Sequence, residues 1–232
     1  RKTCLYSTYD ITPLVRKGAN AFGVLLGNGM YHVPGERYTK FTGSFGPPKL
    51  ILHARIEYAG GKTETISTGE IWRTAPGPMT LSSVYGGEDW DARLEEAGWD
   101  RPGFAEGAGW RPVRVTEGPG GALRSRPMEP IVVRKTLKPV SWKQAGDAWV
   151  ADFGQNASGW PRLRVRGKGG QAVRLIPGEM LKDGRVDQGQ SGGPCYWQYT
   201  LRGGSSEDWR PRFTYYGYRW VQVEGAAPAG KA

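Results

Sequence analysis

The sequence predicts an all-β protein made of two antiparallel, jelly-roll-like β-sandwich domains. Three observations predict this fold class. The 232 residues include 36 glycines and 17 prolines, well above the usual combined share of about 12%. The chain also carries 10 Trp, 11 Tyr and 6 Phe, which a disordered chain would lack. Apolar and polar residues alternate in short segments bounded by turn residues, and no helical pattern reaches ten residues.

The first sandwich is predicted to occupy residues 1–124. A hydroxyl, a proline and a closing glycine frame one helical turn over Thr12–Gly18. The strongest strand signal is at 49–58, where apolar residues from Leu50 to Tyr58 occupy every second position. Gly60-Gly61 then predicts a hairpin that returns through 63–68.

A further strand is expected at 79–85, after a Pro-Gly-Pro break. Residues 86–112 are rich in glycine and are predicted to form a long loop, with one short helical candidate at 92–97. The Pro/Gly cluster at 118–121 indicates a domain boundary.

The second sandwich is predicted over residues 125–232. Its strand candidates are short and are bounded by Gly, Pro or Asp, as in other sandwiches. They lie at 131–137, 149–153, 162–166, 172–176, 196–201 and 218–223.

The formal charge of +10 does not predict nucleic-acid binding, because acidic residues are interspersed with the basic ones and no reader motif is present. The densest basic run, Arg162, Arg164 and Arg166, alternates with apolar residues and is interpreted as a solvated strand face. No apolar stretch approaches the ~18 residues of a membrane span, so no membrane partner is predicted. Cys4 and Cys195 can form one disulfide or remain two free thiols.

The sequence contains few residues in the arrangements that catalytic sites require. His32 and His53 are the only histidines, and His53 falls on the outward face of a predicted strand. No serine lies in a Gly-x-Ser-x-Gly elbow, and no phosphate-binding or dinucleotide-binding loop is present. The sequence therefore predicts neither a nucleophilic triad nor nucleotide chemistry.

One dense carboxylate cluster surrounds a tryptophan: Glu88, Asp89, Trp90 and Asp91, followed by Arg93. Three interpretations stay open. The acids can bind sugar hydroxyls beside a stacking surface, can ligate calcium through oxygens, or can pair with Arg93 and pin a loop. Paired-carboxylate hydrolysis is not favoured, because adjacent residues on a flexible loop are poorly placed across a scissile bond. No other cofactor or metal is predicted.

Aromatic residues are the second functional signal. An indole offers a broad apolar face and one donor, which suits a sugar ring. Most of the ten tryptophans are expected in the core, whereas Tyr31 and the neighbouring Asn28 are candidate carbohydrate-binding or domain-interface residues.

Several stretches together resemble the bacterial α-L-rhamnosidases. The first half is similar to their N-terminal domain, and the second to the concanavalin-like sandwich that follows it. The matching segments are Tyr9-Asp10-Ile11-Thr12, 18–24, 26–31, 77–93, Asp152-Phe153-Gly154-Gln155-Asn156, Gly159-Trp160, Gly178-Glu179 and 211–219.

The resemblance implies an inverting glycoside hydrolase of terminal α-L-rhamnose, with its catalytic acids in an (α/α)6 barrel. The chain is expected to begin after the family's first strands and to end before that barrel, which leaves a non-catalytic portion inactive alone. Expected partners are the barrel and rhamnose-containing glycans. The alternative is a rhamnose-binding module, assisted by calcium. The compartment is not readable, although an extracellular or periplasmic setting fits polysaccharide breakdown.

Overall fold

The computed structural model describes residues 2–35, 37–190 and 192–230. The chain divides into two compact units, each built from separate stretches of sequence. Unit 1 comprises Arg1–Val24, Leu50–Pro76 and Glu96–Thr136. Unit 2 comprises Leu25–Lys49, Gly77–Glu95 and Leu137–Ala232. The predicted boundary near residue 124 stays a prediction about sequence domains, whereas the compact units interleave along the chain.

The all-β fold class is confirmed. In the described ranges helical structure is limited to two three-residue 3-10 helices, η1 (Thr12–Leu14) and η2 (Ala92–Leu94). The strand pairs are antiparallel except for β1–β10 and β8–β17. No helix in these ranges has the length and apolarity to span a bilayer. Cys4 and Cys195 are both free thiols.

Within the part of the chain that the structure describes, unit 1 consists of three two-stranded sheets. The β4–β5 hairpin confirms the predicted pair around Gly60-Gly61, with φ of +79° at Gly61 and Ala54 buried. The unit's strands are β1 (Thr3–Tyr6), β4 (His53–Glu57), β5 (Thr63–Ser67), β6 (Arg73–Thr74), β9 (Arg111–Pro112) and β10 (Ala122–Ser125).

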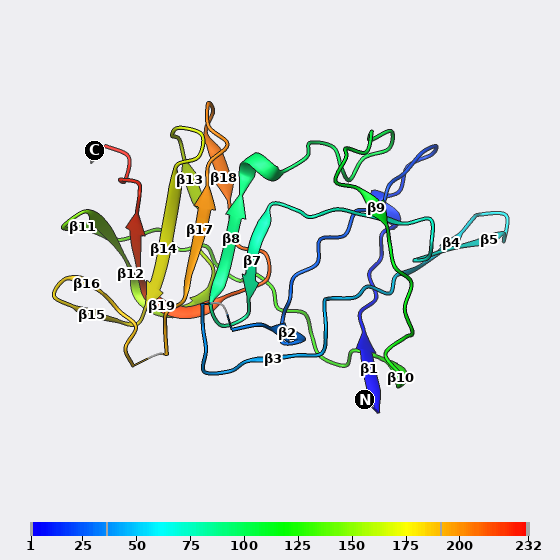
Figure 1. Ribbon diagram of the computed structural model, residues 1–232, viewed down its shortest axis with the longest axis horizontal. Helices are drawn as coiled ribbons and strands as arrows, with labels where there is room; N and C mark the ends of the chain where they lie inside the picture. The colour runs from blue at the N-terminus through cyan, green and yellow to red at the C-terminus, as the bar shows by residue number, and fades with distance from the viewer. Residues whose placement is uncertain (1, 36, 191, 231–232) are drawn as a thin grey trace. The chain divides into compact units, whose positions relative to one another are not determined.

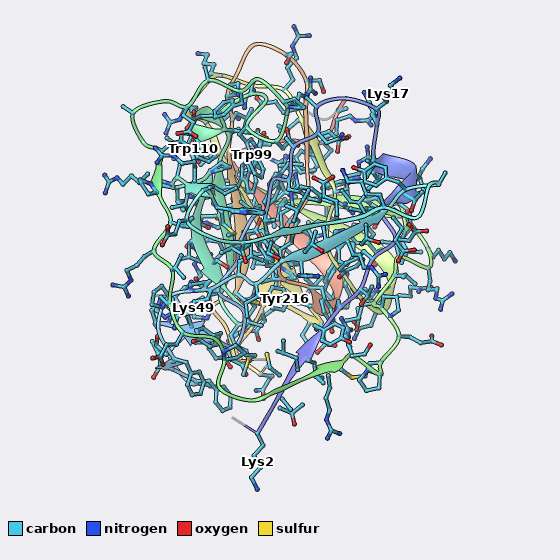
Figure 2. The ribbon with its side chains drawn as sticks, turned by 90° about the vertical axis from the view of Figure 1, so that its right-hand side faces the viewer. Lys2, Lys17, Lys49, Trp99, Trp110 and Tyr216 are labelled. Atoms are coloured by element: carbon cyan, nitrogen blue, oxygen red, sulfur yellow. The ribbon has the colours of Figure 1, made fainter. Side chains whose placement is uncertain are left out.

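Aromatic contacts anchor the glycine-rich loop of unit 1 at residues 98–112. The indole of Trp110, labelled in Figure 2, donates to the Glu96 carboxylate, with 3.2 Å between Nε1 and Oε1. The ring of Phe104 lies edge-on at 5.4 Å from that indole. Gly23 packs so closely on Trp99 that a Cβ would come 2.6 Å from the Trp99 ring. The loop is therefore held by these side-chain contacts as well as by the pairing of β9 with β6 at its end.

Unit 2 is built on a seven-stranded sheet in the order β11-β12-β19-β14-β17-β8-β7 (Figure 1). Its strands are β7 (Met79–Ser83), β8 (Gly87–Asp91), β11 (Ser141–Ala145), β12 (Ala148–Gly159), β14 (Ala172–Gly178), β17 (Tyr196–Thr200) and β19 (Tyr216–Glu224). Two-stranded sheets accompany it: β2 (His32–Val33) with β3 (Gly43–Ser44), β13 (Leu163–Val165) with β18 (Glu207–Trp209), and β15 (Met180–Lys182) with β16 (Arg185–Asp187).

The core of unit 2 lies on one face of the seven-stranded sheet. Trp197 is fully buried at its centre, with Leu175 and Val223 on neighbouring strands. The β13–β18 pair adds Trp209, whose ring stacks on Tyr199 at 5.1 Å between centroids. This pair therefore forms part of a second layer, and its opposite side is turned away from the core.

Two predictions of local structure are wrong. Residues 131–137, predicted as a strand, have no regular structure, and Ile131 and Val133 are exposed. Residues 87–91, predicted as loop, form strand β8. The physical reason is the same in both cases: a strand needs a partner more than it needs β-branched residues.

Candidate functional site: the acidic strand and its clamps

The acidic cluster lies on β8, between β7 and the parallel strand β17. Side chains of a strand point alternately to its two faces. Glu88 and Trp90 face the core and are 0% and 5% exposed, whereas Asp89 and Asp91 lie on the other face. The sheet therefore separates Glu88 from its acidic neighbours.

Glu88 acts as a clamp on the segment that precedes β19. Its Oε2 accepts hydrogen bonds from the backbone amides of Arg212, at 2.9 Å, and Phe213, at 3.2 Å. Its Oε1 is buried without a hydrogen-bond partner among the described residues. Burial raises the pKa of Glu88, and the two amides oppose that rise only in part. Nearby, the Trp197 indole donates to Thr214 Oγ1 at 2.7 Å, which adds a second tie.

Asp89 is held by Arg37, a residue that the sequence analysis missed. Arg37 Nη2 lies 2.6 Å from Asp89 Oδ2, and its side chain is 8% exposed. The same guanidinium donates to the Tyr196 carbonyl at 3.0 Å and lies 3.4 Å above the Tyr196 ring. No sequence signal marks Arg37, because its partners are more than 45 residues away. It ties the 25–49 segment to the sheet.

Asp91 and Arg93 form the ion pair that the sequence analysis gave as its third interpretation. Asp91 Oδ1 accepts from the Arg93 amide at 3.0 Å and thereby caps η2, and Oδ2 lies 2.7 Å from Arg93 Nη2. The hydrogen bonds from Arg93 lower the pKa of Asp91. The pair is a local structural pin, while a carbohydrate or domain-interface role for Glu88, Asp89, Trp90, Asp91 and Arg93 stays a prediction.

Asn28 and Tyr31 belong to the same unit. The Asn28 side chain donates to the Ser82 carbonyl at 2.8 Å, and its backbone amide donates to Ser82 Oγ at 3.1 Å. Ser82 is the β7 partner of Glu88, so Asn28 is anchored beside the acidic strand. The Tyr31 ring lies 5.6 Å from that of Phe45, which is 67% exposed. Their predicted ligand roles are compatible with these positions and stay predictions.

The segment Asp152-Phe153-Gly154-Gln155-Asn156, one of those that carry the family resemblance, forms a bulge in β12. The register against β19 shifts between Asp152 and Ala157, and Gly154 adopts a φ of +77°. Asp152 Oδ1 accepts from the Gly154 amide at 2.7 Å, and the carboxylate receives both Nε and Nη2 of Arg219 at 2.9 Å. Asn156 donates to Glu179. The separate motifs thus meet and hold the bulge.

Asp152→Asn is expected to lower stability at neutral pH by about 1 kcal/mol, because the Arg219 bond loses its charge. The Arg219 hydrogen bond lowers the pKa of Asp152 to about 2. Stability from this carboxylate is therefore complete above its ordinary value of 3.8 and is lost as pH falls towards 2. As pH is lowered from 7 to 2, the urea midpoint of Asp152→Asn should fall less steeply than that of the parent chain. Asp147→Asn, an 85% exposed carboxylate, is the control, and an equal change there would contradict the prediction.

Metal-binding clusters and hollows that could hold a ligand are few in the described ranges. No group of three or more His, Cys, Asp or Glu side chains is arranged to hold a metal ion there. An open hollow of about 170 Å³ is lined by Ala172, Arg174, Gln198, Glu224 and Gly225. Arg174 and Glu224 lie 3.5 Å apart within it. The hollow therefore presents an ion pair, and not two facing carboxylates.

Comparisons with known proteins identify two domains of one family in the chain. Residues 1–135 match the α-L-rhamnosidase N-terminal domain, and residues 143–232 match the bacterial α-L-rhamnosidase concanavalin-like domain. An α-L-rhamnosidase of Streptomyces avermitilis is 38% identical over 97% of the chain. The chain spans only 22% of that relative.

Two solved structures have the same fold over the whole chain. An α-L-rhamnosidase from Dictyoglumus thermophilum gives a TM-score of 0.87 at 35% identity, with 26% of its own chain covered. The Streptomyces avermitilis enzyme complexed with L-rhamnose gives 0.85 at 32% identity, with 22% covered. The chain therefore belongs to the α-L-rhamnosidase family, of which it carries the N-terminal and concanavalin-like domains.

Proposed function

We propose that this chain is a non-catalytic β-sandwich portion of an α-L-rhamnosidase, and that it supports the enzyme's helical catalytic barrel. One observation carries the proposal: helical structure in the described ranges amounts to η1 and η2, each of three residues. An (α/α)6 barrel requires long helices. The bond-breaking acids are therefore proposed to lie in a part of the enzyme other than these residues.

The carboxylates of unit 2 support the same proposal. Glycoside hydrolysis needs two carboxyl groups across a scissile bond, one with a raised pKa. Among the described carboxyl groups the pKa is raised at Glu88, which is 0% exposed and bound to backbone amides. Asp89, the next residue, lies on the opposite face of β8 and is paired with Arg37. This arrangement suits structural clamps and gives a substrate no access.

The purified 232-residue chain is expected to release no nitrophenol from 4-nitrophenyl α-L-rhamnoside above a buffer blank. A full-length α-L-rhamnosidase at equal molarity is the positive control. Glu88→Gln serves as a second check, since it leaves any contaminating activity unchanged. Turnover above the blank that disappears with Glu88→Gln, Asp89→Asn or Asp91→Asn would overturn the proposal.

Sugar binding by the chain itself is the second candidate, and an aromatic cluster in unit 2 favours it. The ring of Tyr85 stacks on Tyr38 at 5.2 Å and lies 5.3 Å from Phe41, which is 60% exposed. Exposed aromatic faces suit sugar rings, and millimolar affinity requires only about −4 kcal/mol. Titration of L-rhamnose against amide chemical shifts, with and without Ca²⁺, tests this candidate. Flat spectra at high sugar concentration would reject it.

A further inference from the structure

We infer that the outward side of the β13–β18 pair in unit 2 is a binding face for an anionic polysaccharide, through carboxylate or sulfate groups. β13 carries Leu163 and Val165 towards the core, so Arg162, Arg164 and Arg166 alternate with them on the other side. The side chains of Arg162 and Arg164 are 65% and 71% exposed. The basic run of the sequence is thus a solvent-facing row along β13, which is labelled beside β18 in Figure 1.

The partner strand adds another cation to this row. β18 is antiparallel to β13, with Leu163 opposite Trp209. Continuing that register by one residue places Arg210 opposite Arg162. Because Trp209 is 5% exposed and faces the core, Arg210 projects outward, and its guanidinium carbon lies 5.9 Å from the Trp160 ring. The face therefore combines a guanidinium row with the half-buried Trp160 ring, over which Arg210 lies.

The local charges do not balance. Among the described residues, Asp208 is the carboxylate that forms ion pairs with this row. It lies 2.7 Å from Arg162 and 3.2 Å from Arg164. Arg166 and Arg210 have no ion-pair partner within the described ranges. The other acid of β18, Glu207, is already bound by Tyr199 Oη at 2.8 Å and by the Arg202 and Gly203 amides at 2.9 Å. Neighbouring like charges on paired strands destabilise a sheet, so an anion would relieve the excess.

The shape of the row favours a polymer. Alternate residues of a strand lie about 6.6 Å apart, so Arg164 of β13 and the flanking Arg162 and Arg166 span about 13 Å. Guanidinium groups match carboxylate and sulfate oxygens in a two-pronged geometry, and an indole accepts the apolar face of a sugar ring. The chain also belongs to a family of glycoside-acting enzymes. These points favour an acidic glycan over nucleic acid, and they do not depend on the proposed support of a barrel.

The test is affinity electrophoresis of the 232-residue chain in gels containing polygalacturonate, dextran sulfate, neutral dextran or single-stranded oligothymidylate. Arg166→Gln combined with Arg210→Gln removes two cations that hold no carboxylate. The matched control, Lys143→Gln combined with Lys182→Gln, removes the same charge from exposed positions on β11 and β15. Thermal unfolding midpoints of both variants should equal that of the parent chain.

We expect at least fivefold weaker binding to polygalacturonate, to dextran sulfate or to both for the arginine variant, and less than twofold weaker binding for the lysine control. Retardation by polygalacturonate identifies uronates as the source of the anion, and retardation by dextran sulfate alone identifies sulfate esters. Equal losses of affinity in both variants would show that binding depends only on the net charge of the chain, and this result would overturn the inference. Tighter binding to oligothymidylate through the same arginines, or equal binding to neutral dextran, would also overturn it.

Discussion

Gly87→Ala is expected to destabilise unit 2 by about 3 kcal/mol or more. Gly87 opens β8 with a φ of +106°, a conformation that L side chains rarely adopt. A Cβ at this position would also overlap the carbonyl oxygen of Tyr196 on the parallel strand β17. Because the Cβ is fixed by the backbone of Gly87 and the overlapped atom is itself a backbone oxygen, rotamer changes cannot relieve the contact, and the two strands must separate.

The measurement for Gly87→Ala is hydrogen exchange of peptides that cover β7, β8 and β17. Protection in these strands should fall by two or more orders of magnitude. Gly46→Ala is the matched control, because Gly46 has a similar φ of +102° and nothing within 4 Å of its added Cβ. It should cost only the conformational strain of about 1–2 kcal/mol. Equal loss of protection in the two variants would show that the overlap with Tyr196 is unimportant.

Glu88→Ala is expected to lower the free energy of unfolding by about 3–5 kcal/mol. The change leaves the buried amides of Arg212 and Phe213 without their acceptor and opens a cavity at a fully buried site. Urea unfolding followed by far-UV circular dichroism measures the loss. Glu117→Ala, which alters an exposed carboxylate in unit 1, should stay within about 0.5 kcal/mol.

Glu88→Gln separates the hydrogen bonds from the charge. Burial raises the pKa of Glu88 above its ordinary value of 4.5, so the native state binds this proton more tightly than the unfolded state does. Stability from this group is therefore complete below about pH 4.5 and is lost as pH rises through the raised pKa. Glu88→Gln keeps a carbonyl acceptor and should remove this decline, so that its advantage over the parent grows with pH. Parallel stability curves from pH 4 to 8 would contradict a raised pKa.

Local patterns predicted the elements whose partners are close in sequence. The β4–β5 hairpin follows from the alternation up to Tyr58 and from Gly60-Gly61, because both strands and their turn lie within 20 residues. The 3-10 turn at Thr12–Leu14 follows from Pro13, whose ring fixes φ. In each case the information that selects the structure is contained in one short window of sequence.

Strand β8 was missed because its residues have low strand propensity. Glycine and aspartate are depleted in strands, and Gly87-Glu88-Asp89-Trp90-Asp91 contains three of them. Its strand geometry depends on pairing with β17, more than 100 residues later. The converse holds at 131–137, where β-branched residues find no partner strand and stay irregular. Propensity was overridden by tertiary pairing at both places.

The candidate site was recognised as a cluster but not in its geometry. Sequence showed Glu88, Asp89 and Asp91 together, and alternation would have separated them had the segment been predicted as a strand. Arg37 and the amides of Arg212 and Phe213 were not predictable, because 52, 124 and 125 residues of chain separate these donors from their acceptors. The Asp91–Arg93 pair, two residues apart, was the one contact that spacing revealed.

Because the two units alternate along the chain, recombination cannot exchange one of them as a single continuous gene segment. A gene segment encoding residues 125–232 would carry β17 but not β8. Trp197 would then lose the neighbouring strand β8, and the amides of Arg212 and Phe213 would lose Glu88 as their hydrogen-bond acceptor. Transfer of either unit as a single cassette would require several simultaneous breakpoints. Recombination should therefore move the two units together. Gene fusions in related genomes should have their junctions outside the segment that encodes both units.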